Sequence, residues 1–362
     1  MPRKRRAGKV PTPPWEVAGR SDLWGHPGRL AALLGVVLLL LAGAGLAIFS
    51  VARGYWEEFT RPGSLALQVA DSRYSLRYFK ERLALYVQQV GGAGSQAAQP
   101  ANAIPSVADR IIEEEILYRY AGELGVSVSP SEIEEAIRER LGLLPPAETP
   151  PAQGGDQPPS PTPPVPSPTP DPFQQLYSQE LERTGLTDDE YRRIVGGELL
   201  AQKALDHLQQ QVPDNMESVH FRQIVLQEAA RADQIIGRIQ GGEDFAAVAR
   251  QESIDTRTRG QGGEVGWVPR GAMNDDLANV IFALEPGGVG KYIHPETGLV
   301  FIVQVLEKDP NRALGPGEKQ LVALKRYRDW VQEKRRGLTI VNHMDLANGD
   351  QTKIRWVVNQ VY

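Results

Sequence analysis

The sequence predicts an α+β chain with an apolar helix near its N-terminus, a mostly helical domain, and a small domain of strands and helices. Three observations predict this class. An uncharged apolar run stands early in the chain, helical periodicity continues to about residue 212, and apolar residues alternate with a period of two from Ser218. The length of 362 residues fits two or three domains.

The N-terminal region predicts a membrane anchor. Residues 1–29 carry seven basic and two acidic side chains, and Leu30–Ala52 then has no charge and no Pro. About 20 apolar residues cross the hydrocarbon core, so we expect a transmembrane helix at 30–52. A cleaved signal peptide is the alternative, because Ala42–Ala44 offers small residues for cleavage, although the run exceeds the usual apolar core of about 7–15 residues.

The basic residues before this span predict its orientation. By the positive-inside rule, residues 1–29 form a cytoplasmic tail and everything after residue 53 lies outside. We therefore expect a single-pass protein of the cell membrane with extracytoplasmic C-terminal domains. The chain after residue 29 has 33 basic and 43 acidic side chains, a net charge of −10, so the exported part is acidic.

Residues 60–212 read as a helical domain with one insertion. Two capping boxes, Ser129–Glu132 and Thr187–Glu190, predict helix starts. The insertion, 145–172, holds 13 of the 28 prolines and predicts an extended or disordered connection, or a ligand for a Pro-binding groove. Apolar side chains recur at helical spacing on both sides of it, at Leu76, Phe79, Leu83, Tyr86, Ile111, Ile112, Ile116, Leu117, Ile133, Ile137, Leu141, Tyr191, Ile194, Leu199 and Leu205.

Beyond residue 213 the pattern predicts a small α+β domain. Its expected elements are a strand at 219–226, helices at 229–240 and 244–252, a Gly-rich turn at 260–271, a helix at 275–284 and a strand at 299–306. Residues 309–362 complete the chain with an amphipathic helix at 320–336 and a weakly patterned tail.

Composition excludes several kinds of function. With 40 basic and 45 acidic residues, the chain has no general basic surface for nucleic acid. It has no Cys, and its five His are scattered without metal-ligand spacing, so we expect neither a metal site nor a cofactor. Gly260–Glu264 lacks the Lys-Ser/Thr ending of a phosphate-binding loop.

An ordered series of motifs carries the functional signal in residues 216–308. The motifs are Ala249–Ser253 with Asp255, Gly262–Trp267, Arg270–Met273, Ile281–Gly287, and Thr297–Gly298 before the apolar run that ends Val305–Lys308. This series resembles the parvulin family of peptidyl-prolyl cis-trans isomerases, which implies a small antiparallel sheet covered by helices. Upstream, Leu65–Leu83, Val107–Ile137 and Leu181–Leu208 resemble the helical chaperone region of SurA and PrsA, exported foldases.

This resemblance implies a site without nucleophile, metal or cofactor. Met273, Leu277 and Phe282 would form an apolar slot for the proline ring, although core packing on one helix face explains the same three residues. Asp255 takes the position of the family's acidic or thiol side chain, and Gln223 is the second expected catalytic residue. The remaining expected substrate contacts are Val265, Trp267, Val300 and Phe301.

The sequence departs from the family at both of its core histidines. Gln223 replaces the first, and Val300, or Phe301 if the strand shifts by one residue, replaces the second. His220 lies three residues from Gln223, so we expect it on the opposite face of the strand, at the surface, and His294 in a loop. The Lys/Arg cluster of phosphate-selective parvulins is missing, which disfavours a phosphoserine-proline preference.

Three functions fit these features. The first is a membrane-anchored extracytoplasmic foldase, a peptidyl-prolyl isomerase that assists the folding of exported proteins. The second is a non-catalytic holdase chaperone on a parvulin fold without its two His. The third is an anchored assembly or scaffold protein. The first two imply unfolded or proline-containing polypeptides as partners, the membrane through residues 30–52, and no nucleic acid.

Overall fold

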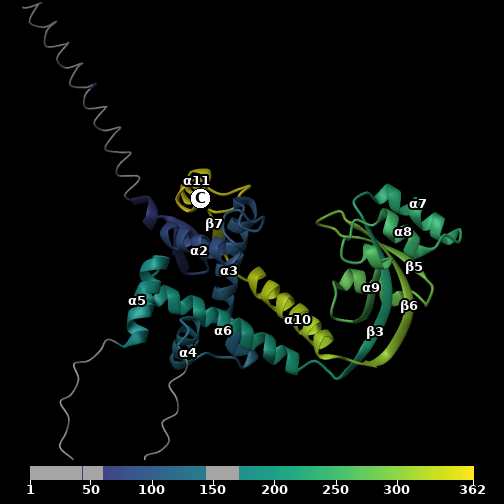
Figure 1. Cartoon of the computed structure of the whole chain (residues 1–362), viewed down its shortest axis with the longest axis horizontal. Helices are drawn as coiled ribbons and strands as arrows, with labels where there is room; N and C mark the ends of the chain where they lie inside the picture. Colours follow the sequence, from purple (N-terminus) through teal and green to yellow (C-terminus); the bar gives the residue numbers. More distant parts are fainter. Residues whose placement is uncertain (1–42, 44–59, 144–170) are drawn as a thin grey trace, which may run out of the picture. The chain divides into compact units, whose positions relative to one another are not determined.

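The computed structural model describes Gly43, residues 60–143 and residues 171–362 (Figure 1). The chain divides into two units, Met1–Ser64 and Leu65–Tyr362. The described part of the first unit contains the short 3-10 helix η2 (Arg61–Gly63). Helices and antiparallel sheets build the second unit, which confirms the predicted α+β class.

Two predicted segments fall largely outside the described residues. They are the span at 30–52, of which only Gly43 is described, and the Pro-rich insertion up to Pro170. Among the described helices, none is both long and apolar enough to cross a bilayer.

In its described parts, 60–143 and 171–212, the predicted helical region contains five α-helices, and η3 (Ala121–Leu124) follows the second of them. Both predicted capping boxes are present, at Ser129 with Glu132 and at Thr187 with Glu190. Each box satisfies backbone N–H groups that a helix start otherwise leaves unpaired, so both helices begin where the sequence predicts. The helices are α2 (Leu76–Gln89), α3 (Pro100–Tyr120), α4 (Pro130–Arg140), α5 (Pro172–Thr184) and α6 (Asp188–Gln210).

The C-terminal segment shares the hydrophobic core of these helices. Its strand β7 adds to β1, and β1 also pairs with β2, giving a three-stranded antiparallel sheet in the order β2-β1-β7. Buried side chains of α10 and of the tail, including Tyr327, Met344 and Val357, join the core formed by α2, α3 and α6. The elements are β1 (Leu65–Val69), β2 (Ser72–Ser75), α10 (Pro316–Arg336), β7 (Ile340–Asn342) and α11 (Gln351–Val361).

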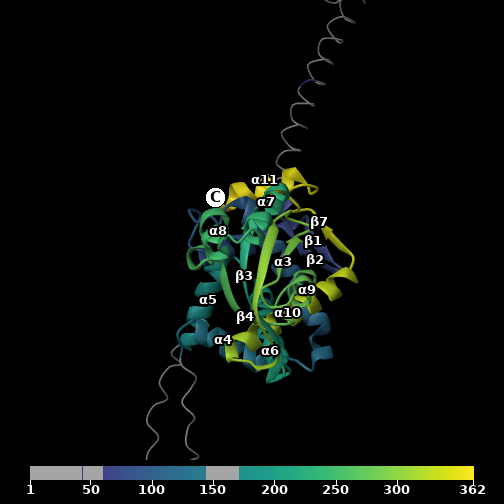
Figure 2. The same ribbon diagram turned by 90° about the vertical axis from the view of Figure 1, so that its right-hand side faces the viewer.

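A four-stranded antiparallel sheet forms the α+β part, in the order β4-β3-β6-β5. Figure 2 labels β4 and β3, and Figure 1 labels β3, β6 and β5. The strands are β3 (Asn215–Leu226), β4 (Glu264–Pro269), β5 (Val289–Ile293) and β6 (Val300–Ala313). The helices are α7 (Ala229–Gln240), α8 (Phe245–Glu252) and α9 (Asp275–Ala283), with the 3-10 helix η4 (Arg259–Gln261) before β4. The Gly-rich stretch expected as a turn therefore contains a strand, and the closing strand is longer than the predicted 299–306.

The two faces of this sheet pack against different helices. Ile224 and Leu226 of β3 point toward α7 and α8 and form one core cluster. Val219 and Phe221 point the other way and pack with α9 in a second cluster. Because successive strand residues alternate between faces, Gln223 lies on the α9 face, and His220 and Arg222 lie on the α7/α8 face.

Candidate functional site

Ser253 fixes the loop that carries Asp255 to the central strand. Its hydroxyl accepts hydrogen bonds from the backbone N–H of Val225, at 3.1 Å, and from that of Asp255, at 3.2 Å. The backbone N–H of Ile254 donates to the carbonyl of Val225 at 2.9 Å. Ser253 is 2% exposed, so a buried hydroxyl holds Asp255 beside β3.

The two residues predicted as catalytic contact each other. The amide nitrogen Nε2 of Gln223 donates to Oδ2 of Asp255 at 2.9 Å. The Thr258 hydroxyl donates to the same oxygen at 2.7 Å, and the backbone N–H of Arg257 donates to Oδ1 at 3.1 Å. Both Gln223 and Thr258 are buried, so the carboxylate of Asp255 is held in one orientation from two sides.

Hydrogen bonds keep Asp255 in its charged form. Burial by itself raises the pKa of this carboxyl, but the bonds from Thr258 and Gln223, the backbone bond at Arg257 and the Arg257 charge outweigh it. The net pKa lies below the ordinary value for Asp. At neutral pH Asp255 is therefore a fixed carboxylate that accepts hydrogen bonds and has no proton to donate.

Thr258 is a site residue that the sequence reasoning missed. It lies three residues after Asp255, a spacing at which an Asp side chain commonly bonds within its own turn. That local signal was available but was not connected with the site. Gly263 was noted only as part of a motif, yet its carbonyl accepts a 2.8 Å hydrogen bond from the backbone N–H of Gln223.

Gly263 has to be a glycine because of this contact. Its φ is +84°, and a Cβ there would lie 2.4 Å from the carbonyl oxygen of Gln223. The close approach of the two backbones sets the position of Gln223 beside Asp255.

Five of the seven predicted substrate contacts gather on the α9 face of the sheet. Phe282 belongs to the buried cluster there, 6% exposed, with Val303 among its members. Four partly buried side chains pack against that cluster: Val265, Met273, Leu277 and Phe301. We call these five residues the α9 cluster.

The strand register connects the α9 cluster with the polar group. Gln223 pairs with Val303 across β3 and β6, and the next pair on the same face of the sheet is Val225 with Phe301. Gln223 therefore shares a sheet face with Phe301. The predicted contacts Met273, Leu277 and Phe282 pack as core residues and also border the face that carries the hydrogen-bonded carboxylate.

Cationic groups flank Phe282. The guanidinium carbon of Arg270 lies 4.1 Å from the centre of the Phe282 ring, and Nε of Arg270 donates to Glu217 at 2.5 Å. The ammonium group of Lys308 donates to the carbonyl oxygen of Phe282 at 2.9 Å. The C-terminal end of α9 is thus held by a cation, as helix C-termini favour.

Two predicted contacts lie on the other face of the sheet. Val300 is fully buried in the cluster beneath α7 and α8, one residue and hence one face away from Phe301. Trp267 pairs with His220 in the strand register and stacks on its ring at 5.5 Å. The prediction that Val300 and Trp267 line the slot is therefore wrong, and Phe301, not Val300, faces the site.

His220 is half-buried, not a surface residue. Its side chain is 21% exposed, its Nε2 is hydrogen-bonded to Glu264, and its Nδ1 lies 3.8 Å from Glu307. His220 does lie on the sheet face opposite to Gln223, as strand alternation predicts. His294 lies in the turn between β5 and β6, where its Nδ1 accepts the backbone N–H of Glu296 at 3.3 Å, as expected for a loop residue.

Within residues 60–143 and 171–362, no group of three or more His, Cys, Asp or Glu side chains is arranged to hold a metal ion. The site offers the hydrogen-bonded carboxylate of Asp255 and the apolar side chains of the α9 cluster. Such a set can position an uncharged amide against a fixed anion, with apolar side chains beside it.

Comparison with known proteins assigns a family model to this part of the chain. The model described as the PPIC-type PPIASE domain matches residues 210–309. Chaperone SurA of Xanthomonas euvesicatoria pv. vesicatoria (strain 85-10) is 38% identical over 79 residues, which is 22% of this chain and 17% of that protein. Foldase protein PrsA of Caldanaerobacter subterraneus subsp. tengcongensis is 34% identical over 85 residues, 24% of this chain and 28% of that protein. The chain thus spans less than a third of the length of either relative.

Solved structures of related description also match. A crystal structure of peptidylprolyl isomerase (PrsA) from Bacillus anthracis aligns with a TM-score of 0.38 and 14% identity, covering 69% of this chain and 95% of that one. A foldase protein PrsA from Streptococcus pneumoniae aligns with a TM-score of 0.33 and 14% identity, covering 81% and 97%. The family model and the curated relatives confirm the resemblance predicted from the sequence, to a parvulin-type isomerase domain in a chain similar to SurA and PrsA.

Proposed function

We propose that this chain, whose residues 210–309 match the PPIC-type PPIase domain, is a membrane-anchored extracytoplasmic foldase that accelerates cis-trans isomerisation of X-Pro bonds. The observation that carries the proposal is the hydrogen-bonded group of Gln223, Asp255 and Thr258 on the sheet face that also bears the α9 cluster. The clients are unfolded or proline-containing polypeptides, which the helical region holds near the isomerase site.

The reaction suits a site of this composition. Rotation about an X-Pro bond crosses about 18–20 kcal/mol, whereas the cis and trans forms differ by only about 0.5–1 kcal/mol, so an enzyme has to stabilise only the twisted amide. The reaction is a rotation in which no covalent bond forms or breaks, and no cofactor is required. The apolar side chains of Met273, Leu277, Phe282 and Phe301 receive the proline ring.

The Asp255 carboxylate supplies the electrostatic part. A planar amide carries partial negative charge on its oxygen through resonance, and that charge falls as the bond twists. A fixed anion near this oxygen therefore disfavours the planar form more than the twisted one, which lowers the barrier between them. Gln223 and Thr258 prevent the carboxylate from turning away.

One observation favours a second candidate, a holdase that binds proline-containing chains without isomerising them. Phe301, one of the two positions at which the resemblance places the family's second His, is the one that faces the site. A phenyl ring has no hydrogen-bond donor or acceptor in its plane, so it adds apolar contact and removes a polar partner from the site.

Exchange spectroscopy distinguishes the two candidates. Cis-trans exchange of a short Ala-Pro peptide is measured by NMR with and without the full chain. We expect exchange to accelerate, and to fall at least tenfold in an Asp255→Ala, Met273→Ala variant, because a lost charged hydrogen-bond group costs about 1.5–3 kcal/mol. An Asp233→Ala, Ile236→Ala variant likewise removes one carboxylate and one apolar side chain, but on α7 at the other face, and keeps the rate. Peptide shifts without faster exchange would support the holdase and exclude the isomerase.

The charge distribution before residue 30 and the uncharged run at 30–52 support an extracytoplasmic location for the residues after 53. Protease added to sealed spheroplasts tests it. We expect cleavage of residues after 53 and protection of residues 1–29, and the reverse pattern would refute the orientation.

A further inference from the structure

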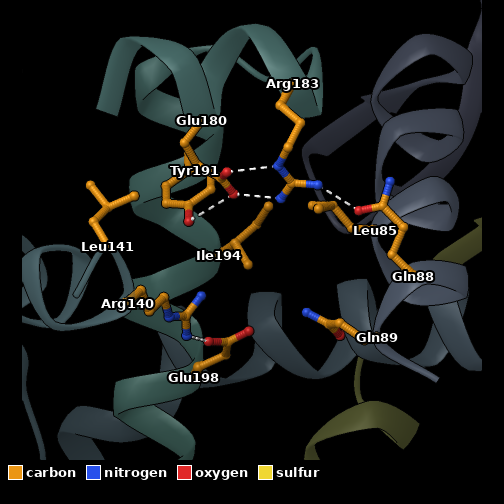
Figure 3. Close-up of a pocket in the computed structure, with 10 residues that line it drawn as sticks. All are labelled: Leu85, Gln88, Gln89, Arg140, Leu141, Glu180, Arg183, Tyr191, Ile194 and Glu198. Carbon is orange, nitrogen blue, oxygen red and sulfur yellow. Dashed lines mark hydrogen bonds and ion pairs between the residues drawn. The ribbon is translucent and has the colours of Figure 1, made fainter. Parts of the chain in front are cut away.

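A cavity of about 370 Å³ opens in the helical region, among α2, α5, α6 and the C-terminal end of α4 (Figure 3). This volume falls at the low end of the range for ligand sites, roughly 300–1,000 Å³. Its walls come from helices that also share the core with α3. A cavity of this size accommodates a short stretch of polypeptide and not a folded domain.

Apolar side chains cover part of the cavity wall. Tyr191 and Ile194 of α6 are each 6% exposed, and the partly buried Leu85 of α2 and Leu141, which directly follows α4, add to the lining. The Tyr191 hydroxyl is occupied locally, because it donates to Glu180 at 3.4 Å. The apolar part of the wall is thus available to an aliphatic or aromatic side chain.

The charged groups of the wall neutralise one another. Arg183 binds both carboxylate oxygens of Glu180, at 2.8 and 2.7 Å. Arg140 forms an ion pair with Glu198 on the facing side (Figure 3). With two cations and two anions already paired, a charged ligand gains little here and loses part of its hydration. The wall therefore favours an uncharged ligand.

Two consecutive carboxamides complete the lining. The side-chain oxygen of Gln88 accepts from Arg183 at 2.5 Å, and that of Gln89 accepts from Arg110 at 3.3 Å. Their oxygens are thus engaged, and neither amide nitrogen has a hydrogen-bond partner among the residues that the structure describes. Figure 3 shows the Gln89 amide at the cavity wall. Amide N–H groups at this place suit backbone carbonyls of an extended chain.

We propose that this cavity binds an extended, uncharged stretch of an unfolded polypeptide. One apolar side chain of the client rests against Tyr191 and Ile194, and its backbone carbonyls accept hydrogen bonds from Gln88 and Gln89. The inference rests on the proposed holding of unfolded chains by the helical region and names the place and the chemistry. It requires no proline in the client, so it is independent of the isomerase site.

Fluorescence anisotropy of a labelled, proline-free peptide tests the proposal on the full chain. The peptide has one central Leu among Ser, Gly and Asn residues. A Gln88→Ala, Gln89→Ala variant should bind about tenfold more weakly, since each lost hydrogen bond costs about 0.5–1.5 kcal/mol. A Gln174→Ala, Gln175→Ala variant makes the same change at exposed positions of α5 outside the cavity and should bind as the parent does.

Charge gives a second, independent readout. Replacing the central Leu of the peptide by Glu or by Lys should weaken binding at least tenfold in both cases, and added salt should leave the affinity of the Leu peptide unchanged. Leu141→Asp, at a partly buried position after α4, should weaken the Leu peptide while circular dichroism shows the parent helix content. Equal affinity of all variants, or a preference for one sign of charge, would overturn the proposal.

Two further variants distinguish client binding from occupation of the cavity by the chain's own segment, and cavity binding from isomerase activity. The chain leaves the described region at Leu143, beside the cavity residue Leu141, and returns at Asp171. If the client peptide binds only after residues 144–170 are replaced by Gly and Ser, and a peptide of that sequence competes, the cavity serves the chain's own segment and the client proposal fails. An Asp255→Ala, Met273→Ala variant should keep full peptide affinity, so loss of isomerase activity and loss of cavity binding are distinguished.

Discussion

Removing Arg82 should destabilise the helical region severely. Arg82 of α2 is 6% exposed and binds both carboxylate oxygens of Glu114 of α3, at 2.8 and 2.5 Å, and the hydroxyl of Tyr78 at 3.1 Å. Glu114 is 8% exposed. In Arg82→Met this carboxylate stays buried without its counter-ion, and breaking such a pair costs about 3–5 kcal/mol.

Hydrogen exchange by mass spectrometry measures this cost locally. Amides of α2 and α3 should exchange roughly a hundred- to several-thousand-fold faster in Arg82→Met, and those of β3 should not change. Adding Glu114→Gln should restore most of the protection, because the orphaned charge is then gone. Arg335→Met breaks a more exposed pair, 2.8 Å from Asp109, and should cost less than about 1 kcal/mol. If Arg82→Met and Arg335→Met cost the same, the argument from burial is wrong.

Three further predictions concern the isomerase site and the C-terminal segment. Thr258→Val removes a bond that holds the pKa of Asp255 down, so the pKa rises. Asp255 stabilises the fold above its unfolded pKa, and this stabilisation is lost as pH falls through its lower folded pKa. In Thr258→Val this contribution should become smaller. NMR titration of the carboxyl carbon and acid unfolding measure the change. Gly263→Ala places a Cβ 2.4 Å from the Gln223 carbonyl oxygen at a positive φ, so we expect the free energy of unfolding to fall by about 1–3 kcal/mol. The acceleration of X-Pro cis-trans exchange should also be lost, and a parent-like rate would contradict this prediction. Deleting residues 337–362 removes β7 and several buried side chains, each worth about 2–5 kcal/mol, so exchange protection should vanish in α2 and α3 but persist in 215–305.

The site could be predicted from the sequence where its residues lie close together in the chain. The predicted helix end at Glu252 is where α8 ends, and Asp255 of the same motif follows it, held by a hydrogen bond from its backbone N–H to the Ser253 hydroxyl. Strand alternation likewise placed His220 and Gln223 on opposite faces. The degree of burial of His220 was missed, because it depends on Trp267 and Glu264 of a strand that the Gly-rich sequence concealed.

Long-range pairing accounts for the other differences. The choice between Val300 and Phe301 depends on how β6 is registered against β3, and a shift of one residue exchanges the faces. The tail read as weakly patterned because β7 has three residues and its partner β1 lies at the other end of the described chain. Neither the β3–β6 register nor the β1–β7 pairing produces a hydrophobic periodicity within a single segment of the sequence.

The loss of both family histidines has a consequence for the pH dependence of the proposed isomerase. His220 lies on the α7/α8 face, and His294 bonds the backbone of its own turn, with its ring 6.3 Å from that of Tyr292. Asp255 is the carboxylate of the proposed site, and its pKa is lowered.

We therefore expect the exchange rate of an Ala-Pro peptide to stay flat from mildly acidic through neutral pH and to fall only in strong acid. Phe301→His should add a new limb near the ordinary His pKa of about 6.5, because a ring that titrates then stands on the site face. Leu299→His, in the turn before β6, is the control and should add none. A bell-shaped profile in the parent chain would show that a second titrating group works at the site and that the carboxylate does not act alone.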